Sequence, residues 1–254
     1  MIKLFRNLRK QLLNEGKTSK YFKYAIGEIV LVVIGILIAL QINNWNENKK
    51  AEEKQHYLFA NLKIDFESRL TELKEFNTAR EGHIKALLKL NKIIANKDTI
   101  PNGSEIDSLL SKLINGLKFN EEFKMLDVVF STGLINDIKN ETLKRQLIEW
   151  PQKVEEMLEE QRMLNQLIDE KWLYHISNYL SLRDIYEKFD FRQYNIPTGE
   201  PITLTKNYKG FLEDPQTENY VAQKQQLIRV IYMDTNTLIT SADVIVSLLN
   251  KELE

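Results

Sequence analysis

The pattern of apolar residues in this 254-residue chain changes at about residue 43. Residues 29–40 carry no polar side chain, and with its flanks the apolar stretch extends over residues 25–42. That length is close to the roughly 20 residues that cross the hydrocarbon core of a bilayer. Soluble helices of this length are rarely apolar on every side. The pattern therefore predicts a membrane-spanning helix over residues 25–42 rather than a buried helix of a soluble protein.

Beyond the span, apolar residues recur every three or four positions, which is typical of helices that pack on helices. The predicted helices cover residues 51–97, 104–117, 121–131, 140–189 and 217–252. We expect Ser104, Asn120 and Asn140 to be N-caps, and Pro151 to kink or break the fourth helix. The predicted fold is all-α, with one N-terminal transmembrane helix followed by an elongated antiparallel helical bundle with one long loop.

The predicted long loop covers residues 190–216, which hold three of the five prolines of the chain. Residues 201–205 are predicted as a short extended piece. The aromatic residues of the loop are expected to pack over the bundle, and long ordered loops often carry binding sites. The predicted organisation is therefore a basic cytoplasmic segment over 1–24, the span over 25–42 and an extracytoplasmic helical domain over 43–254.

The charges on either side of the span predict its orientation. Seven basic residues and one acidic residue, Glu15, precede it, whereas lysines and glutamates alternate after it. Because basic flanks stay on the cytoplasmic side, we expect a single-pass inner-membrane protein with a cytoplasmic N-terminus and a periplasmic C-terminal domain. A cleaved signal peptide has the same order of basic and apolar residues, but residues 37–45 lack the small-residue pair that cleavage needs. The span is therefore expected to remain as a signal anchor.

The first 24 residues have two interpretations. Ile2, Phe5, Leu8 and Leu12 would share one face of a helix, with basic residues elsewhere around it. Such an amphipathic helix would lie in the inner interface and be attracted to anionic lipid. The alternative is a disordered basic tail that only sets the topology.

Four residues in and after the span are candidates for contacts within the membrane. Glu28 places a carboxylate about one turn inside the apolar stretch, where its side chain either reaches the headgroups or pairs with a group on another transmembrane helix. Gly35 and Ala39 form a small-x-x-x-small pattern that permits close approach of helices. Trp45 lies where aromatic residues anchor the end of a span at the interface. The expected partners are the lipid bilayer and either another protein or a second copy of this chain.

Composition outside the span argues against several classes of function. Residues 1–42 hold 7 of the 35 basic and 2 of the 36 acidic side chains, so residues 43–254 hold 28 and 34 and carry a net charge of −6. This sign disfavours nucleic acid as a partner, because phosphates require basic surfaces. The chain has no cysteine, which excludes disulfides, a thiol nucleophile and cysteine-bound metals.

Residues that usually carry catalysis are few and scattered. Glu53 and His56 have the spacing of a di-iron ligand pair, but such sites need two pairs and the sequence offers no second, so a solvated helix face is the simpler interpretation. No glycine-rich phosphate loop, zinc-protease helix or nucleophile elbow occurs, although sequence alone leaves a Ser-His-Asp triad open. Trp150 and Trp172 are expected in the core. We therefore assign no catalytic, cofactor-binding or metal residue, and expect no cofactor and no enzymatic activity.

Short blocks around the span resemble the N-terminal signature of an uncharacterised family of single-span membrane proteins of Gram-negative bacteria. These blocks are Tyr-Ala-Ile-Gly-Glu-Ile at 24–29, Gly-Ile-Leu-Ile-Ala-Leu at 35–40 and Asn-Asn-Trp-Asn at 43–46. Residues 131–135, followed by Ile138, Asn140 and Leu143, resemble a second block of the same family. The resemblance implies a helical extracytoplasmic domain and supplies no activity or ligand.

Three classes of function follow from these patterns. The first is a membrane-tethered interaction module that binds another envelope protein or itself, with a ligand-sensing ectodomain acting through a membrane partner as its close variant. The second is an enzyme with a site near the loop at 190–216. The third is a passive spacer. Long helices and the small-residue pattern in the span favour the first class.

Overall fold

The computed structural model describes residues 18–96, 100–116, 119, 123–189 and 205–254. All regular secondary structure in these ranges is helical, which confirms the predicted all-α class. The chain forms two units, residues 1–58 and residues 59–254. The amphipathic segment predicted within residues 1–17 and most of the extended piece predicted at 201–205 lie outside the described residues.

In the first unit, the described residues belong to a single helix. This helix, α2 (Thr18–Ala95), begins before the predicted span and continues without interruption through residues 25–42 and on into the second unit. The sequence predicts that the helix over residues 51–97 runs on from the span, and the structure confirms this, since no proline occurs between residues 18 and 95 to stop the helix. The backbone of the apolar segment is therefore hydrogen-bonded entirely within the helix, as a segment inside a bilayer must be.

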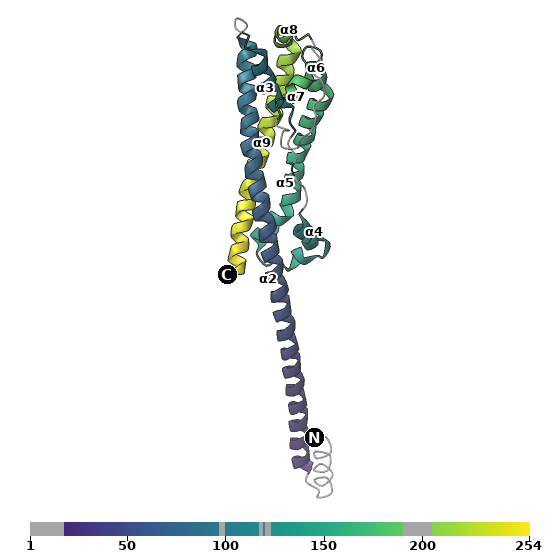
Figure 1. The fold of residues 1–254 in the computed structure, drawn as a ribbon. Helices are drawn as coiled ribbons and strands as arrows, with labels where there is room; N and C mark the ends of the chain where they lie inside the picture. Colours follow the sequence, from purple (N-terminus) through teal and green to yellow (C-terminus); the bar gives the residue numbers. More distant parts are fainter. Residues whose placement is uncertain (1–17, 97–99, 117–118, 120–122, 190–204) are drawn as a thin grey trace. The chain divides into compact units, whose positions relative to one another are not determined.

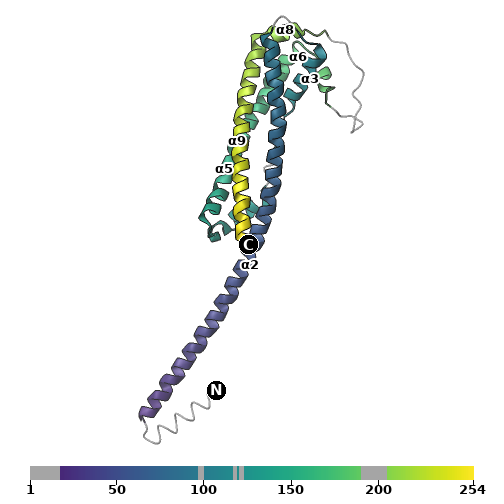
Figure 2. The same ribbon diagram turned by 90° about the vertical axis from the view of Figure 1, so that its left-hand side faces the viewer.

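Three long helices lie side by side in the second unit (Figures 1 and 2): the part of α2 from Phe59 onward, α5 (Glu141–Gln166) and α9 (Pro215–Leu253). Two amide pairs fix the direction of α9 against α2. Asn91 Nδ2 donates to Gln225 Oε1 and Asn77 Nδ2 donates to Asn236 Oδ1, both at 2.9 Å. The partner numbers rise along α9 as they fall along α2, so the two helices are antiparallel.

Helix α9 is also antiparallel to α5. Lys153 Nζ lies 3.1 Å from Ser241 Oγ, and Asn140 Nδ2, at the start of α5, lies 2.9 Å from Glu252 Oε1. Two helices that are each antiparallel to a third run parallel to one another. Helices α2 and α5 are therefore parallel, and the chain between them must return along the bundle.

That return contains α3 (Gly103–Ile114), α4 (Lys124–Ser131) and the 3₁₀ helix η1 (Leu134–Asp137). An ion pair of 2.6 Å between Lys89 and Glu105 holds α3 near the end of α2. The backbone N–H of Met125 donates to Asp65 Oδ2 at 3.1 Å, far back along α2. Gly133 follows α4 with a φ of 75°, a left-handed conformation that favours glycine.

The fourth predicted helix, over residues 140–189, is confirmed up to residue 177 and is wrong beyond it. Helix α5 passes Pro151 without a break and continues into the π-helix η2 (Leu167–Trp172) and α6 (Leu173–Ser177). The chain then leaves the helix, and α7 (Leu182–Tyr186) begins at a new N-cap, because Ser181 Oγ accepts from the backbone N–H of Asp184. Within the predicted loop, residues 208–213 form the short helix α8 (Tyr208–Glu213).

Of the three predicted N-caps, one is confirmed and one is wrong. Asn140 Oδ1 accepts from the backbone N–H groups of Thr142 and Leu143 at 3.1 Å. Ser104, however, lies inside α3, because Asn102 Oδ1 accepts from the backbone N–H of Ser104 and caps the helix two residues earlier. Asn120 lies outside the described residues, and α4 begins only at Lys124 rather than at residue 121.

The core of the second unit is mostly apolar along the three long helices. The predicted core positions of α9 are all buried: Ile228, Ile231, Leu238, Ala242, Ile245 and Leu249. Both tryptophans expected in the core are also buried, with Trp150 0% and Trp172 1% exposed. The ring of Trp150 meets that of Phe66 edge to face, with centroids 4.9 Å apart. The packed rings of α2 and α5 therefore form one end of the core.

Candidate functional site

Helix α2 contains, from Ala25 onward, a segment long and apolar enough to cross a membrane. Its most apolar window of 18 residues has a mean hydropathy of 2.6, and none of that window is buried in the structure. Apolar surface in water costs about 25 cal/mol per Å², so burial of this segment in apolar surroundings would be favourable. A buried core helix passes the same test of length and composition, but it would be covered by other elements.

The structure places three of the four predicted site residues on one face of this helix. At about 100° per residue, Gly35 and Ala39 lie within about 20° of Glu28 around the helix axis. Glu28 is half-buried, whereas Gly35 and Ala39 are exposed. A Cβ atom added at Gly35 would meet no atom within 4 Å. A carboxylate is thus aligned with a surface of small residues that permits close approach of another helix.

Trp45, the fourth predicted residue, lies on α2 beyond the apolar segment. Its side chain is 66% exposed, and Lys49 Nζ lies 5.9 Å from the centre of its ring. Indole rings with a cation close by suit the headgroup layer, where apolar and polar surroundings meet. The role of Trp45 as an interface anchor stays a prediction.

In the second unit, an arginine lies in the middle of the core. Arg80 of α2 is 2% exposed. Its guanidinium donates to Thr235 Oγ1 on α9 and, at 3.2 Å, to Gln161 Oε1 on α5. It also approaches Met157 Sδ at 3.8 Å and lies 5.2 Å from the ring centre of Phe76. One side chain therefore links the three long helices.

A buried lysine occupies a neighbouring position on α9. Lys224 is 2% exposed, and its ammonium group donates to the backbone carbonyl of Leu113 near the end of α3. Burial lowers the pKa of Lys224 to about 7 and the pKa of Arg80 to about 10. Within the described parts of the chain, neither cation forms an ion pair with a carboxylate.

The two cations line a small cavity together with a histidine. His83 of α2 is half-buried, and burial together with the charges of Lys224 and Arg80 lowers its pKa to about 4. The cavity measures about 10 Å³, room for a single water molecule. Its lining consists of Arg80, His83, Asn115, Gln161, Leu164, Lys224 and Ile228. The group of polar residues that surrounds it, Arg80, His83, Asn115, Gln161 and Lys224, is called the cationic layer below.

The cationic layer predicts a characteristic pH dependence of stability. Between about pH 7 and pH 10.5 the unfolded chain holds a proton on Lys224 that the folded chain does not, so the free energy of unfolding should rise with pH by up to about 1.4 kcal/mol per unit. Below about pH 7 both states hold this proton and the slope from Lys224 ends. As pH falls from 6.5 to about 4, His83 in turn lowers the stability.

Urea unfolding of the full chain at fixed ionic strength, from pH 4 to pH 10, would measure this profile. Lys224→Met should remove the alkaline rise. Lys74→Met, at an exposed lysine that ion-pairs with Asp243 at 3.7 Å, should retain it. An alkaline slope that Lys224→Met leaves unchanged would contradict the assignment.

A second buried polar group surrounds His175, where α6, α8 and α9 meet. His175 Nε2 lies 2.7 Å from Thr217 Oγ1, which itself donates to the carbonyl of Phe211, so the histidine is the donor. Asp214 Oδ2 accepts from the hydroxyl of Tyr179 at 2.7 Å and lies 3.9 Å from the same Nε2. A catalytic triad needs the nucleophile and the carboxylate on opposite ring nitrogens. The geometry therefore joins helices and does not form a triad.

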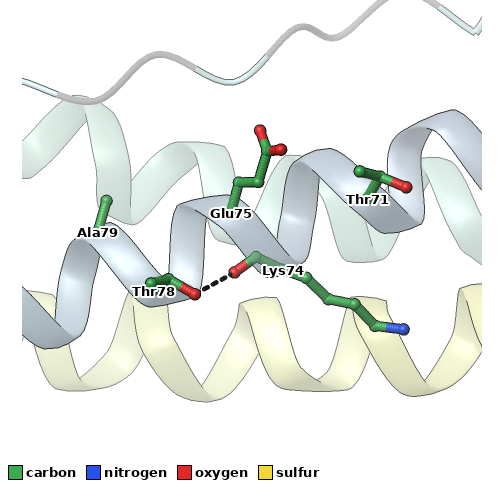
Figure 3. Close-up of a pocket in the computed structure, with 5 residues that line it drawn as sticks. All are labelled: Thr71, Lys74, Glu75, Thr78 and Ala79. Carbon is green, nitrogen blue, oxygen red and sulfur yellow. Dashed lines mark hydrogen bonds between the residues drawn. The ribbon is translucent and has the colours of Figure 1, made fainter.

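A larger hollow, with a volume of about 500 Å³, lies on the surface of α2 (Figure 3). It is lined by Thr71, Lys74, Glu75, Thr78 and Ala79. Thr71 and Thr78 donate to carbonyls of their own helix at 3.0 Å, and Lys74 and Glu75 point away from each other. Because no polar groups converge on the hollow, we assign it no ligand.

Among the described residues, no group of three His, Asp or Glu side chains lies close enough to hold a metal ion. The pair with di-iron spacing, Glu53 and His56, is exposed on α2. This agrees with the interpretation of the pair as a solvated helix face.

Sequence reasoning missed Arg80 and Lys224, although the signal was present. Residues 59, 66, 73, 80 and 87 of α2 are spaced by seven and are all buried, and so are residues 217, 224, 231, 238 and 245 of α9. Both cations thus occupy the core position of a heptad. A search for regularly spaced apolar residues does not find Arg80 and Lys224, because a charged side chain is expected on the surface.

A comparison with models of protein families gives a match over part of the chain. Residues 28–116 match the model of a family described as "Family of unknown function (DUF6090)". The matched region begins at Glu28 and includes Gly35, Ala39, Trp45 and Arg80. It supports the expected resemblance to an uncharacterised domain family. No curated protein and no solved structure matches the chain.

Proposed function

We propose that this chain is a membrane-anchored interaction module, whose apolar helix binds another membrane protein or a second copy of the chain while its helical unit lies outside the cytoplasm. The observation that carries the proposal is the single face of α2 on which a carboxylate, Glu28, lies in line with Gly35 and Ala39. A lone anchor needs only apolar side chains. A carboxylate within an apolar segment, in line with small residues on one face, is typical of helices that pack in a membrane.

The basic segment before the span supports a cytoplasmic N-terminus, and the −6 charge of residues 43–254 fits a domain on the other side. Within this arrangement, the helical unit would present its surface to other proteins of the cell envelope. The proposal assigns no catalytic residue.

Crosslinking of the full-length protein in its native membranes, followed by affinity isolation and mass spectrometry, tests the proposal. Recovery of one stoichiometric envelope protein, or of crosslinked dimers of the chain itself, is the expected result. If neither is recovered although the protein is itself intact and membrane-embedded, the interaction proposal is wrong and a passive anchor remains.

Glu28→Leu is expected to leave membrane insertion intact and to reduce the recovered complex. Hydrogen bonds between membrane helices contribute about 1–2 kcal/mol, which corresponds to a loss of roughly 5- to 30-fold in affinity. Titration of the crosslinked fraction against expression level would measure this change. Recovery of identical complexes from the wild type and the variant would show that Glu28 does not contribute to the interface.

Two glycines of the span provide a matched test of the small-residue face. Gly35→Ile should weaken the same complex, because a branched side chain at this position keeps the partner helix away. Gly27→Ile is the control, since it places the same side chain about 80° around the helix from Gly35. Both glycines have open space around them in the structure. Equal effects of the two substitutions would show that the interface does not follow this face.

A second candidate function, a ligand-sensing ectodomain that acts through a membrane partner, is favoured by the cationic layer of the second unit. Buried cations without carboxylate partners are costly, and such groups cluster at binding sites. Because α2 carries both the span and Arg80, a ligand that changed the packing around Arg80 would act directly on the helix that enters the membrane.

A further inference from the structure

The cationic layer has an unusual charge balance. The titratable groups that line its cavity are Arg80 and His83 from α2 and Lys224 from α9, while α3 and α5 contribute only the amides Asn115 and Gln161. All of these groups are cationic or neutral. The ring face of Phe76 lies 5.2 Å from the Arg80 guanidinium, but a cation–π contact offsets only a fraction of a full charge.

The hydrogen bonds of the two cations are also incomplete. A guanidinium has five N–H donors and an ammonium has three. Arg80 makes three contacts, to Thr235, Gln161 and Met157, and Lys224 makes one, to the carbonyl of Leu113. Four N–H groups of these two buried side chains therefore lack an acceptor among the described residues.

The neutral residues of the cationic layer differ in their burial and in their hydrogen bonds. Gln161 is buried, accepts from Arg80 and donates to Asn165 Oδ1 at 3.1 Å, so its polar atoms are already engaged. Asn115 is exposed, and His83 is half-buried. The cavity is thus lined by two buried cations and also by polar residues that are partly exposed to solvent.

We propose that this cavity binds a monovalent anion of the size of chloride, held between Arg80 and Lys224. A volume of about 10 Å³ admits a single water molecule or a monoatomic ion and is too small for phosphate or sulfate. Below about pH 7, where Lys224 is protonated, a water molecule would satisfy donors but would leave two buried positive charges without compensation, whereas an anion supplies both acceptor and charge. This inference concerns the second unit alone and does not depend on the proposed interaction within the membrane.

Thermal unfolding of the full-length protein in detergent tests the site. Sodium chloride would replace sodium gluconate at constant ionic strength, because gluconate is too large for the cavity. For an affinity near 10 mM, saturation with 150 mM chloride should raise Tm by roughly 3–6 °C. The rise should be larger at pH 6 than at pH 8.5, since Lys224 is protonated only at the lower pH. An unchanged Tm at both pH values overturns the proposal.

Two lysine variants separate this cavity from other chloride effects. Lys224→Met should abolish most of the chloride-dependent rise, and Lys74→Met, with the same change in net charge at an exposed position, should retain it. Equal responses of both variants and the wild type would place the chloride elsewhere and overturn the proposal. A Lys224-dependent rise of the same size with sodium sulfate would overturn the assignment to a chloride-sized ion.

A direct measurement covers the case in which Lys224→Met does not fold. Crystals of the wild-type protein grown in sodium bromide should show an anomalous peak between the Arg80 guanidinium and the Lys224 ammonium group. Absence of that peak, at a bromide concentration that saturates the Tm effect, would contradict the site.

Discussion

Trp150→Ala is expected to lower the free energy of unfolding of the second unit by about 3–5 kcal/mol, the range measured when large buried aromatic side chains are truncated. Trp150 is 0% exposed, and its ring meets those of Phe66 at 4.9 Å and Phe123 at 5.4 Å, both edge to face. Phe123 lies in the return segment and Phe66 in α2. Loss of the indole would therefore loosen three parts of the bundle at once.

The indole nitrogen of Trp150 has no hydrogen-bond partner in the described structure. The expected loss is therefore due to packing alone, and no buried donor or acceptor is left behind. A cavity of about 170 Å³ already borders the ring, so neighbouring side chains have little support there to fill the space that the indole leaves. Urea unfolding followed by circular dichroism measures the change.

Trp45→Ala is the matched control. It removes the same side chain from a position that is 66% exposed in the first unit, and we expect it to change the free energy of unfolding of the second unit by less than about 0.5 kcal/mol. A loss of less than about 1 kcal/mol for Trp150→Ala would contradict the packing around this ring.

The double substitution Ile34→Arg with Ile38→Arg is expected to release most of the protein from the membrane. About a dozen large aliphatic residues of the apolar segment contribute roughly 0.3–0.6 kcal/mol each to insertion, or about 4–7 kcal/mol together. Two arginines near the centre of the span cost about 5–7 kcal/mol on the same scale. The balance for insertion then falls to zero or becomes unfavourable. Extraction of membranes with alkaline carbonate and quantification of the pellet measures the result.

The control for this experiment is Ile64→Arg with Ile148→Arg in the second unit. These isoleucines are 62% and 52% exposed, against 49% and 53% for Ile34 and Ile38. The four positions are thus similarly exposed in the structure, and only the surroundings proposed for the span distinguish them. Full retention of both variants in the membrane pellet would argue against a span at residues 25–42.

The long helices could be predicted because their signal is repeated many times. Each of α2 and α9 carries several turns of apolar residues at helical spacing, so an error at one position leaves the pattern intact. Features that depend on one residue, such as the position of an N-cap, were harder to predict. Asn102 and Ser104 are both good N-caps, and the choice between them depends on the path of the preceding chain.

The break after α6 shows why periodicity alone was insufficient. Leu180 and Ile185, on either side of the new N-cap, are 5% and 0% exposed, so the apolar residues remain in the core although the backbone has left the helix. A local signal did exist, because Ser181 and Asp184 have the spacing of a capping box. The cationic layer was missed for the opposite reason, since its residues keep the helical spacing and differ only in polarity.

The pairing of α2 with α9 has a consequence for synthesis of the protein. The contacts between these helices join residues far apart in the chain, such as Asn77 with Asn236 and Asn91 with Gln225. At a synthesis rate of about 5–20 residues per second, roughly 10–30 s pass between synthesis of the apolar face of α2 and synthesis of the α9 residues that cover it. During this interval the apolar face of α2 in the second unit is exposed. The apolar segment of the same helix, from Ala25 onward, is long and apolar enough to enter a membrane. Folding of the second unit should therefore be completed only after α9 (Pro215–Leu253) has been synthesised. Before residue 215 has emerged, the nascent chain is a substrate for a chaperone that binds exposed apolar surface.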